Sequence, residues 1–444
     1  MLDMHRYSVY TFLIDVSADY FYAHDTKTKI NITTTQFNMS VISCNSSATF
    51  EGFVREDGRV GTRNYVGVFV AGNCAATSAR KIADWFNAER LKNYPNVDGV
   101  VPFVHEIGCG MEMTGEPMDL LRRTLSGFIR HPNMAAAIVL ALGCERNNIY
   151  SFMEQEALTT GPMLHTLVMQ ELGGTVNTIN AGIAAIESML PAANDVVRQT
   201  VSAKHLSVGV LCAGDDALAA RAASPALGVA IDTLVRQGGT GILTATSSIA
   251  PMAQSLAARA ESSDIKQKLE QRIQWWDKYT QNRDTRYNHQ KHRANVDHAF
   301  MNTLEQNARR AGTTPLKGVY EYAKPIIDPG LAFMDAPSFD AVSATGQIAS
   351  GANMICLATG SGSSFGSLPA PAIKLAATSE LFESMEDDFD IDCGLAETGM
   401  LDIDHLGQLI FESILDHASG KKTKSEIIGI GENEFVPWPI GAFA

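Results

Sequence analysis

The chain has 444 residues, of which 45% are hydrophobic and 19% charged, and this composition is typical of a globular protein with two or three domains. Its formal net charge of −14 argues against a nucleic-acid partner, because neutralising phosphates needs a basic face. An apolar run of about 18 residues is absent from the sequence, so we expect no membrane span. The seven cysteines include no CxxC pair and the N-terminus lacks a signal-peptide pattern, which together predict a cytoplasmic location.

Residues 1–50 are rich in Thr, Ser and Asn, and we interpret them as an N-terminal extension without an assigned function. From Gly52 onward, six apolar, β-rich runs each end in a loop of small residues. Continuous apolar runs are typical of strands that are buried on both faces of a parallel sheet. The six predicted strand–loop segments are residues 64–74, 135–145, 206–216, 238–248, 330–338 and 353–363.

Helical patterns lie between several of these strands. Strands that alternate with helices predict an α/β fold of mostly parallel sheets flanked by helices, with right-handed crossovers. A polar stretch near residues 190–206 divides the pattern, so we expect two Rossmann-like α/β domains, at residues 51–200 and 201–444. Residues 281–311 are polar and basic, and we expect a loop there that leads into a surface helix. The predicted helices are residues 76–91, 117–129, 225–239 and 265–279.

The small-residue loops are the first candidates for a site, because ligands of parallel sheets bind beyond the carboxyl ends of the strands. The stretch HEIGCGMEMTGE holds His105 and Cys109, and the loop LGCERN holds Cys144 and Glu145. Imidazole, thiolate and carboxylate groups suit a divalent metal, and they equally suit a general base beside a reactive thiol. The third interpretation is a packed turn without chemistry, since free cysteines are usually buried.

Three arginines precede the first predicted strand. In FVREDGRVGTRNY, the residues Arg55, Arg59 and Arg63 follow one another at spacings of four, and the glycines between them indicate a turn. Such a cluster could grip a carboxylate through bidentate hydrogen bonds. The alternative is a surface loop in which the arginines pair with Glu56 and Asp57.

Later segments offer further candidates for ligand binding. The loop TGSGSSFGSLPAPAIK ends in Lys374, and it could form an anion-binding nest or a plain glycine-rich turn. It is neither a Walker loop nor a dinucleotide fingerprint. The segment FMDAPSFDAVSATGQ carries two carboxylates, followed by Thr345 and Gln347. The acidic stretch EDDFDIDCG could bind a hard cation, although a run of charges is more often a solvated face.

Taken together, these motifs resemble the altronate/galactarate dehydratase family of sugar-acid lyases. The resembling segments run in order from about Gly52 to the C-terminus, and several of them are long and unusual. They are GFVREDGRVGTRNYVGV, NCAATSARKIA, YPNVDGVVPFVHEIGCGM, RTLSGFIRHPNMAAAIVLALGCE, PALGVAIDTLVRQGGTGIL, TTPLKGVYEYAKPI, FMDAPSFDAVSATGQIASGAN, TGSGSSFGSLPAPAIKLA, DDFDIDCG and NEFVPWPIGA.

The resemblance implies a cytoplasmic hydro-lyase that acts on a sugar acid such as altronate or galactarate. A proton would leave the carbon beside the carboxylate, and a hydroxyl would leave the next carbon. The resemblance further implies a divalent metal, with Fe2+ expected first and Mn2+, Mg2+ or Zn2+ as alternatives. It implies a homo-oligomer and allows a small β-rich partner subunit of the SAF type, because residues 1–50 do not resemble the family's β-rich N-terminal domain.

The resemblance also implies roles for individual residues. We expect His105, Cys109 and Cys144 to ligate the metal, with His105 as ligand or general base. Glu145 would complete the catalytic set. The expected substrate-binding residues are Arg55, Arg59, Arg63, Asn73, Thr345, Gln347 and Lys374.

The sequence departs from the family in loops that should line the site. Ala245 and Ser248 stand where glutamates are expected, and Ser361 stands where an arginine is usual. Two alternatives to the dehydratase therefore stay open. One is the large subunit of a (2R)-sulfolactate sulfo-lyase, and the other is a non-catalytic paralogue with a degenerate site.

Overall fold

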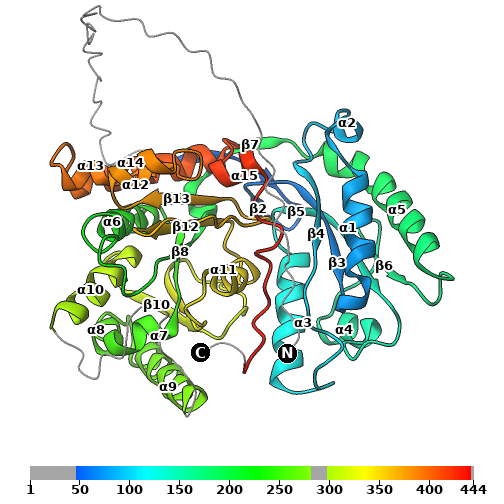
Figure 1. The fold of residues 1–444 in the computed structure, drawn as a ribbon, viewed down its shortest axis with the longest axis horizontal. Helices are drawn as coiled ribbons and strands as arrows, with labels where there is room; N and C mark the ends of the chain where they lie inside the picture. Colours follow the sequence, from blue (N-terminus) through cyan, green and yellow to red (C-terminus); the bar gives the residue numbers. More distant parts are fainter. Residues whose placement is uncertain (1–46, 282–297, 442–444) are drawn as a thin grey trace, which may run out of the picture. The chain divides into compact units, whose positions relative to one another are not determined.

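The computed structural model describes residues 47–281 and 298–441, and two parallel sheets carry the fold in these residues (Figure 1). The smaller sheet has four strands in the order β4-β3-β5-β6. Every side chain of β3 is buried, as expected for a central strand that helices cover on both faces. The strands of this sheet are β3 (Tyr65–Val70), β4 (Gly99–Phe103), β5 (Met134–Ala141) and β6 (Leu164–Val168).

The larger sheet has seven strands in the order β10-β11-β9-β8-β12-β13-β14, and each neighbouring pair is parallel. Its central strand β8 is also the first of the seven along the chain, so the later strands are added on both sides of it. The strands are β8 (Ser207–Leu211), β9 (Thr240–Leu243), β10 (Leu316–Tyr320), β11 (Gly330–Met334), β12 (Met354–Thr359), β13 (Ala372–Ala376) and β14 (Ile391–Asp392).

Helices cover both faces of the smaller sheet. On one face, α1 (Ala76–Trp85) and α5 (Thr175–Asp195) bury apolar side chains against the strands. On the other face, α3 (Glu116–Ile129) packs against α11 (Asp340–Ala349), which follows the larger sheet (Figure 1). A Cβ atom at Gly127 of α3 would lie 2.4 Å from the Ala349 carbonyl oxygen, so the two helices can approach this closely only because a glycine is present.

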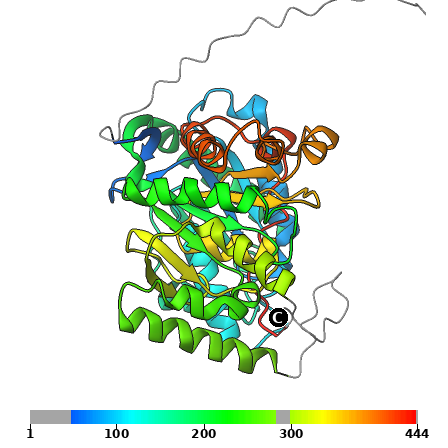
Figure 2. The ribbon, with the colours of Figure 1, turned by 90° about the vertical axis from the view of Figure 1, so that its left-hand side faces the viewer.

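The opposite face of the larger sheet is covered by α6 (Ala223–Arg236) and α14 (Ile403–Ala418), which pack against each other (Figure 2). The remaining α-helices lie in the connections. They are α2 (Ala88–Leu91), α4 (Ile149–Gln155), α7 (Thr246–Ile249), α8 (Ala253–Ala257), α9 (Ser263–Thr280), α10 (His298–Ala308), α12 (Ser379–Ser384), α13 (Gly394–Glu397) and α15 (Lys424–Ile428).

The predicted α/β fold is confirmed. Each of the six predicted strand–loop segments contains a strand, and each of the four predicted helical segments is helical, although residues 76–91 are divided into α1 and α2 at Phe86. The helix expected within residues 281–311 is α10, whereas the loop before it lies outside the described residues. Most of the proposed N-terminal extension also lies outside them, and the domain division near residue 200 stays a prediction.

A small antiparallel sheet was not predicted. It has the order β2-β1-β7 and consists of β1 (Thr49–Val54), β2 (Val60–Gly61) and β7 (Arg198–Ser202). The ladder between β1 and β7 joins residues that are far apart in the chain, and β7 has no fully buried position that would produce an apolar pattern. In the part of the chain that the structure describes, none of the helices has the length and hydropathy needed to cross a membrane.

A buried ion pair ties the start of β3 to the C-terminal region. The Arg63 guanidinium donates to both carboxylate oxygens of Glu426, from Nε to Oε1 at 2.6 Å and from Nη2 to Oε2 at 2.8 Å. The remaining Arg63 donors bond main-chain carbonyl oxygens of Thr62, His417 and Lys421. Only 2% and 6% of the two side chains are exposed, so loss of either partner would leave a buried charge uncompensated.

The substitution Glu426→Ala is therefore expected to lower the free energy of unfolding by about 3–5 kcal/mol. The matched control is Asp57→Ala, which breaks the Arg59–Asp57 pair at the surface, where the two side chains are 49% and 52% exposed. That change should cost less than about 1 kcal/mol, because exposed pairs contribute little. Urea unfolding followed by tryptophan fluorescence measures both, and equal losses would contradict the structural role of the buried pair.

The same pair has a pH signature. Hydrogen bonds and charge from Arg63 lower the pKa of Glu426 despite its burial. A carboxylate whose pKa is lower in the folded state stabilises the protein above its unfolded pKa, and this contribution disappears as the pH falls through the folded pKa. Wild type should accordingly lose more stability than Glu426→Gln between about pH 5 and pH 3, where unfolded glutamates become protonated.

Candidate functional site

The candidate site lies where the chain reverses direction across the smaller sheet. From β3 the chain passes to β4 on one side, and then to β5 on the other side of β3. In open α/β sheets, ligands bind beyond the carboxyl ends of the strands at such a topological switch point. Three loops meet there, and they begin after Val70, Phe103 and Ala141. All three contain one of the cysteines at residues 74, 109 and 144.

Main-chain and side-chain hydrogen bonds hold these loops together. The Asn73 N–H donates to the carbonyl oxygen of Ile107 at 3.2 Å, and the Asn147 N–H donates to that of Gly108 at 2.9 Å. The Asn147 side-chain amide also donates to the carbonyl oxygen of Ala71 at 2.9 Å. Asn147 is fully buried and contacts both other loops, so it fixes their relative positions.

Gly108 allows the loop after β4 to pass against the turn after β3. Its φ is +102°, a conformation that side chains with a Cβ rarely adopt, and an added Cβ would lie 2.5 Å from the Ala71 carbonyl oxygen. On the opposite side of the contact, a Cβ at Gly72 would lie 3.3 Å from the Cys109 sulfur. The contact between the two loops is therefore an approach of backbone to backbone.

This approach brings thiols together. The Sγ atoms of Cys74 and Cys109 are 3.6 Å apart; Cys74 is exposed and Cys109 is half-buried. Burial and the hydrogen bond to Cys74 raise the pKa of the Cys109 thiol, and the charges of Glu145 and Cys144 raise it further. Cys144 is exposed, so three thiols gather at the switch point.

His105 has a structural role in this loop. Its Nε2–H donates to the carbonyl oxygen of Val70 at 3.0 Å, and its Nδ1 accepts from the Ile107 N–H at 3.3 Å. Since a carbonyl can only accept and an N–H can only donate, this geometry assigns the tautomer. Burial lowers the pKa of His105 to about 4, so the ring is neutral at pH 7. With both nitrogens bonded to the backbone, the ring has no lone pair to offer a metal or a substrate proton.

Glu145 and Asn73 also stabilise loop backbone. The Glu145 carboxylate accepts from the N–H groups of Leu142 at 3.0 Å and Gly143 at 2.6 Å, and it closes the turn that exposes Cys144. The Asn73 amide donates to the carboxylate of the neighbouring loop residue Glu106 at 3.3 Å. Both predicted residues thus lie at the switch point with the thiols, as His105 does.

The C-terminal segment, residues 430–441, passes beside the same loops (Figure 1). The Phe435 ring packs against Phe103 and Phe128, and its centroid lies 6.4 Å from that of His105. The Thr345 hydroxyl donates to the Glu434 carbonyl oxygen at 3.1 Å and accepts from the Val436 N–H at 3.0 Å. Thr345, which was expected to bind substrate, therefore positions this segment.

Glu434 carries an unusual carboxylate. Its Oε2 atom is buried without a hydrogen-bond partner among the described residues. Burial raises the pKa of this carboxyl group, and the backbone N–H groups of Glu434 and Asn433 and the positive charge of Lys374 oppose the shift. On either side of it, Asn433 accepts a hydrogen bond from Arg80 of α1 at 3.3 Å, and Phe435 lies against His105. The two neighbours of Glu434 are thus fixed to elements of the switch point.

Lys374 and Gln347 lie inside the larger sheet region. Lys374 is fully buried on β13, and its ammonium group donates to the Ser363 carbonyl oxygen at 3.0 Å and to Asp388 at 3.4 Å. The Gln347 amide donates to the Ile242 carbonyl oxygen at 2.8 Å, and the side chain is fully buried. Both predicted substrate ligands are thus bonded within the larger sheet region, and the charge of Lys374 reaches Glu434.

The three arginines predicted to bind a carboxylate lie at the opposite ends of the strands of the smaller sheet, before β3. A strand of six residues spans roughly 20 Å, so they are far from the thiols. Arg63 has all its donors bonded within the chain, and Arg55 donates to the Pro132 carbonyl oxygen at 2.7 Å and to Asn64 at 2.8 Å. The sequence pattern predicted that these arginines bind a substrate carboxylate. In the structure, Arg55 and Arg63 instead form hydrogen bonds within the chain that hold the first strands in place.

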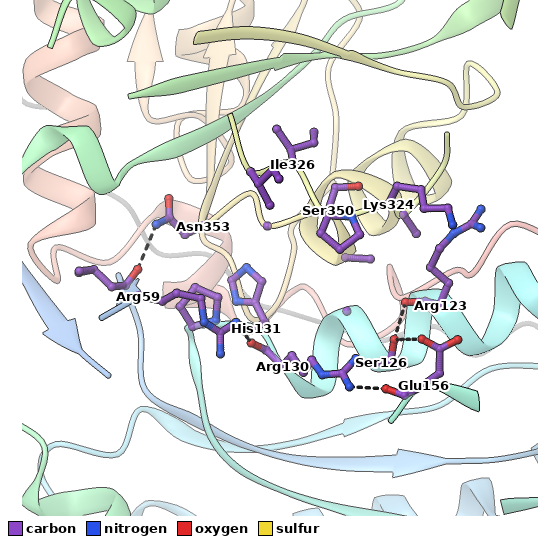
Figure 3. Close-up of a pocket in the computed structure, with 18 of the residues that line it drawn as sticks. Arg59, Arg123, Ser126, Arg130, His131, Glu156, Lys324, Ile326, Ser350 and Asn353 are labelled. Carbon is purple, nitrogen blue, oxygen red and sulfur yellow. Dashed lines mark hydrogen bonds between the residues drawn. The ribbon is translucent and has the colours of Figure 1, made fainter. Parts of the chain in front are cut away.

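Arg59 lines a cavity of about 800 Å³ at that edge, between α3 and the end of α11 (Figure 3). Two of the arginines that line this cavity already form hydrogen bonds with carbonyl oxygens at the ends of helices. Arg130 donates to the carbonyl oxygens of Glu156 and Ala157 beyond the C-terminus of α4, and Arg59 donates to that of Arg130. Cations at helix C-termini oppose the negative end of the helix dipole. Some of the hydrogen-bond donors of these arginines are therefore already used within the fold.

The expected metal ligands do not fit a metal as they are arranged. His105 has no free nitrogen. Among the described residues, no group of three or more His, Cys, Asp and Glu side chains is placed to hold a metal ion. The metal stays a prediction, and we assign no chemical step to it.

Sequence reasoning missed Cys74, Asn147 and Glu434. A signal for Cys74 was present, because it ends the first predicted strand–loop segment, just as Cys144 lies in the loop at the end of the second. Asn147 and Glu434 act through contacts with residues far away in the chain, which spacing alone does not reveal.

Comparisons with known proteins cover both sheets. Residues 52–194 match the family model described as D-galactarate dehydratase/altronate hydrolase, second domain, and residues 203–443 match D-galactarate/altronate dehydratase, C-terminal. The galactarate dehydratase (L-threo-forming) of Escherichia coli is 30% identical over 389 residues, which are 84% of this chain and 73% of that protein. The altronate dehydratase of Bacillus subtilis is 26% identical over 422 residues, covering 93% and 83%.

A relative of another name matches a larger share of its own length. The (2R)-sulfolactate sulfo-lyase subunit beta of Chromohalobacter salexigens is 26% identical over 400 residues, which are 87% of this chain and 96% of that protein.

The role of Gly108 is testable with a pair of substitutions. Gly108→Ala should lower the free energy of unfolding by about 1–3 kcal/mol, because alanine is strained at positive φ and its Cβ meets Ala71. Gly110→Ala is the control, since no atom lies within 4 Å of its added Cβ, and it should change stability by less than about 0.5 kcal/mol. Thermal unfolding measures both. A neutral Gly108→Ala variant would mean that the loop does not pass this close to the turn.

Proposed function

The chain belongs to the D-galactarate/altronate dehydratase family, and we propose that it is a hydro-lyase that removes water from a sugar acid such as altronate or galactarate. The family match across both sheets carries the proposal, and the three loops that converge at the switch point supply a site for it. Relatives named as dehydratases support a lyase, and the particular sugar acid is our inference.

The reaction needs three functions from the chain. A base must remove the proton beside the carboxylate, and cationic or hydrogen-bonding groups must stabilise the enediolate that develops. A proton donor must then convert the departing hydroxyl into water. Each of these can be assigned to a residue at or beside the switch point.

We assign the base to Glu434. A base needs a lone pair that no other group occupies, and the buried Oε2 of Glu434 meets this need. Its raised pKa makes the carboxylate a stronger base than an exposed glutamate. Thr345 holds the main chain on both sides of this residue, which limits its movement.

We assign the role of proton donor to Cys109, and we assign the binding of the substrate carboxylate to Arg80. The raised pKa of Cys109 keeps its thiol protonated at neutral pH, so it has a proton to give. Arg80 extends from α1 toward the C-terminal segment and is 42% exposed, with a 4.0 Å ion pair to Glu432 and a hydrogen bond of 3.3 Å to Asn433. Its guanidinium is thus accessible to a carboxylate in a bidentate arrangement.

A divalent metal stays part of the proposal without a step of its own. Fe2+ is the first expectation, with Mn2+, Mg2+ and Zn2+ as alternatives, and metal analysis of anaerobically purified protein tests it. We also keep the sugar acid as substrate, a homo-oligomer, and a small β-rich partner subunit as proposals.

The second candidate is the sulfo-lyase reaction on (2R)-sulfolactate. The match to 96% of the sulfo-lyase subunit beta favours it, because this share is larger than for the dehydratases. The two reactions begin with the same proton abstraction, and they differ in whether hydroxide or sulfite leaves. The same residues could therefore serve either reaction.

Purified protein incubated separately with altronate, galactarate and (2R)-sulfolactate separates the candidates. We expect formation of a 2-keto-3-deoxy acid from one of the two sugar acids, measured by chromatography. Sulfite release from sulfolactate would replace the first proposal by the second. Thermal stabilisation by these acids without any turnover, with and without Fe2+, would instead indicate a non-catalytic paralogue.

Glu434→Gln tests the assignment of the base. With the substrate that is turned over, kcat should fall by about 100-fold or more, because general bases contribute this much, while KM changes little. In wild type, kcat should rise with pH through the raised pKa of Glu434, since the carboxylate must be deprotonated to act, and the variant should lack this limb. Glu383→Gln, an exposed glutamate on α12, is the control. An unchanged pH profile in Glu434→Gln would remove Glu434 from the mechanism.

A further inference from the structure

We propose that Cys74 and Cys109 form a reversible thiol–disulfide switch at the site. Their sulfur atoms are 3.6 Å apart, and a disulfide requires about 2.05 Å, so closure needs a movement of only about 1.5 Å. The pair joins two different loops, the turn after β3 and the loop after β4. A bond between them would fix the relative position of these two walls of the switch point.

The proximity of the two thiols is imposed by the backbone. Asn73, beside Cys74, donates its N–H to Ile107, and Gly108, beside Cys109, lies against Ala71. Both cysteines therefore follow a residue that is held by the opposite loop. Because the loops are held without help from the thiols, the reduced state already has the two sulfurs in position.

Accessibility sets the order of the reaction. Cys74 is exposed and meets an oxidant first, whereas Cys109 is half-buried. With hydrogen peroxide as oxidant, Cys74–SH and H2O2 give Cys74–SOH and water. The Cys109 thiol then attacks this sulfenic acid, loses its proton, and forms the S–S bond with release of a second water molecule. A dithiol reductant reverses the bond by thiol–disulfide exchange.

The remaining described cysteines serve as internal references. Cys212, Cys356 and Cys393 are buried, and burial raises the pKa of Cys212 to about 12 and raises those of the other two. Such thiols react slowly. Cys144 is exposed and close enough to affect the pKa of Cys109, so it is the competing partner that the experiment must distinguish.

Trypsin separates the three thiols of the site. Cleavage after Arg63, Arg80, Lys92, Arg122, Arg130 and Arg146 places Cys74, Cys109 and Cys144 in the peptides 64–80, 93–122 and 131–146. The reduced full-length protein is treated with a small excess of hydrogen peroxide, its free thiols are blocked, and the digest is analysed without reductant. We expect peptides 64–80 and 93–122 to be joined and to separate after treatment with dithiothreitol.

Matched variants identify the pair. Cys74→Ser and Cys109→Ser should abolish the joined peptide, and Cys144→Ser should leave its yield unchanged. Gly108→Ala should slow the joining severalfold relative to Gly110→Ala, because it moves the loop away from the turn. A predominant link between peptides 93–122 and 131–146, or oxidation of Cys74 without any link, would overturn the proposal.

A consequence for activity rests on the proposed function. The disulfide consumes the thiol proton of Cys109, so oxidation should abolish dehydration and dithiothreitol should restore it. The joined peptide is measured independently of turnover. Absence of the peptide refutes the switch whatever the activity, whereas absence of activity in the reduced wild type refutes the dehydratase and leaves the peptide result to decide the switch.

Discussion

The site depends on one contact, the passage of Gly108 against the main chain of Ala71 and Gly72. The contact needs a positive φ and the absence of a Cβ, and glycine alone supplies both without strain. This contact brings the sulfur of Cys109 to 3.6 Å from that of Cys74. It also holds the Gly108 carbonyl oxygen in place to accept a hydrogen bond from the Asn147 N–H. The buried amide of Asn147 then fixes Ala71 in turn. The three loops are thus one mutually bonded unit, and no single loop could hold its thiol in place alone.

The two edges of the smaller sheet use polar groups in opposite ways. At the end before β3, the guanidinium groups donate to carbonyl oxygens and to Glu426, so their hydrogen-bond donors are already used within the fold. At the switch point, thiols are accessible and one carboxylate oxygen, on Glu434, is buried without a partner. Unpaired buried polar atoms are costly, so they are rare unless a function retains them. This asymmetry supports the proposal that the chemistry takes place at the switch point.

The fold could be predicted from the sequence because its signal is local. Strands such as β3 and β12 are continuous apolar runs, and each ends in residues too small to continue a packed strand. The β1–β7 ladder could not be predicted, because it pairs residues about 150 positions apart without a strong pattern in either strand. A local pattern thus predicts an element, but it does not predict which distant element pairs with it.

The same distinction explains which parts of the site could be anticipated. Parallel strands bring their carboxyl ends to one edge, so the cysteines after β3, β4 and β5 had to lie near one another. The role of His105 was not accessible, because the partner of its Nε2 is a carbonyl 35 residues away. The structural role of Arg63 could not be predicted either, because its partner Glu426 lies 363 residues further along the chain. Residue type predicted the chemistry a side chain could perform, and only the fold decides whether a partner already occupies it.

The protonation state of Cys109 connects the reaction with the redox chemistry. Hydroxide leaves carbon poorly unless it is protonated, so a dehydratase needs an acid near the departing group. Sulfite departs as a stable anion and needs no such acid. Partial burial, the hydrogen bond to Cys74 and neighbouring negative charges raise the pKa of Cys109, which keeps its thiol protonated and makes it a poor nucleophile toward peroxide. Cys74 is exposed, whereas Cys109 is half-buried, so Cys74 meets the oxidant first of this pair. A disulfide would therefore remove what dehydration requires and sulfite elimination does not, so the two candidate reactions should differ in their sensitivity to oxidation.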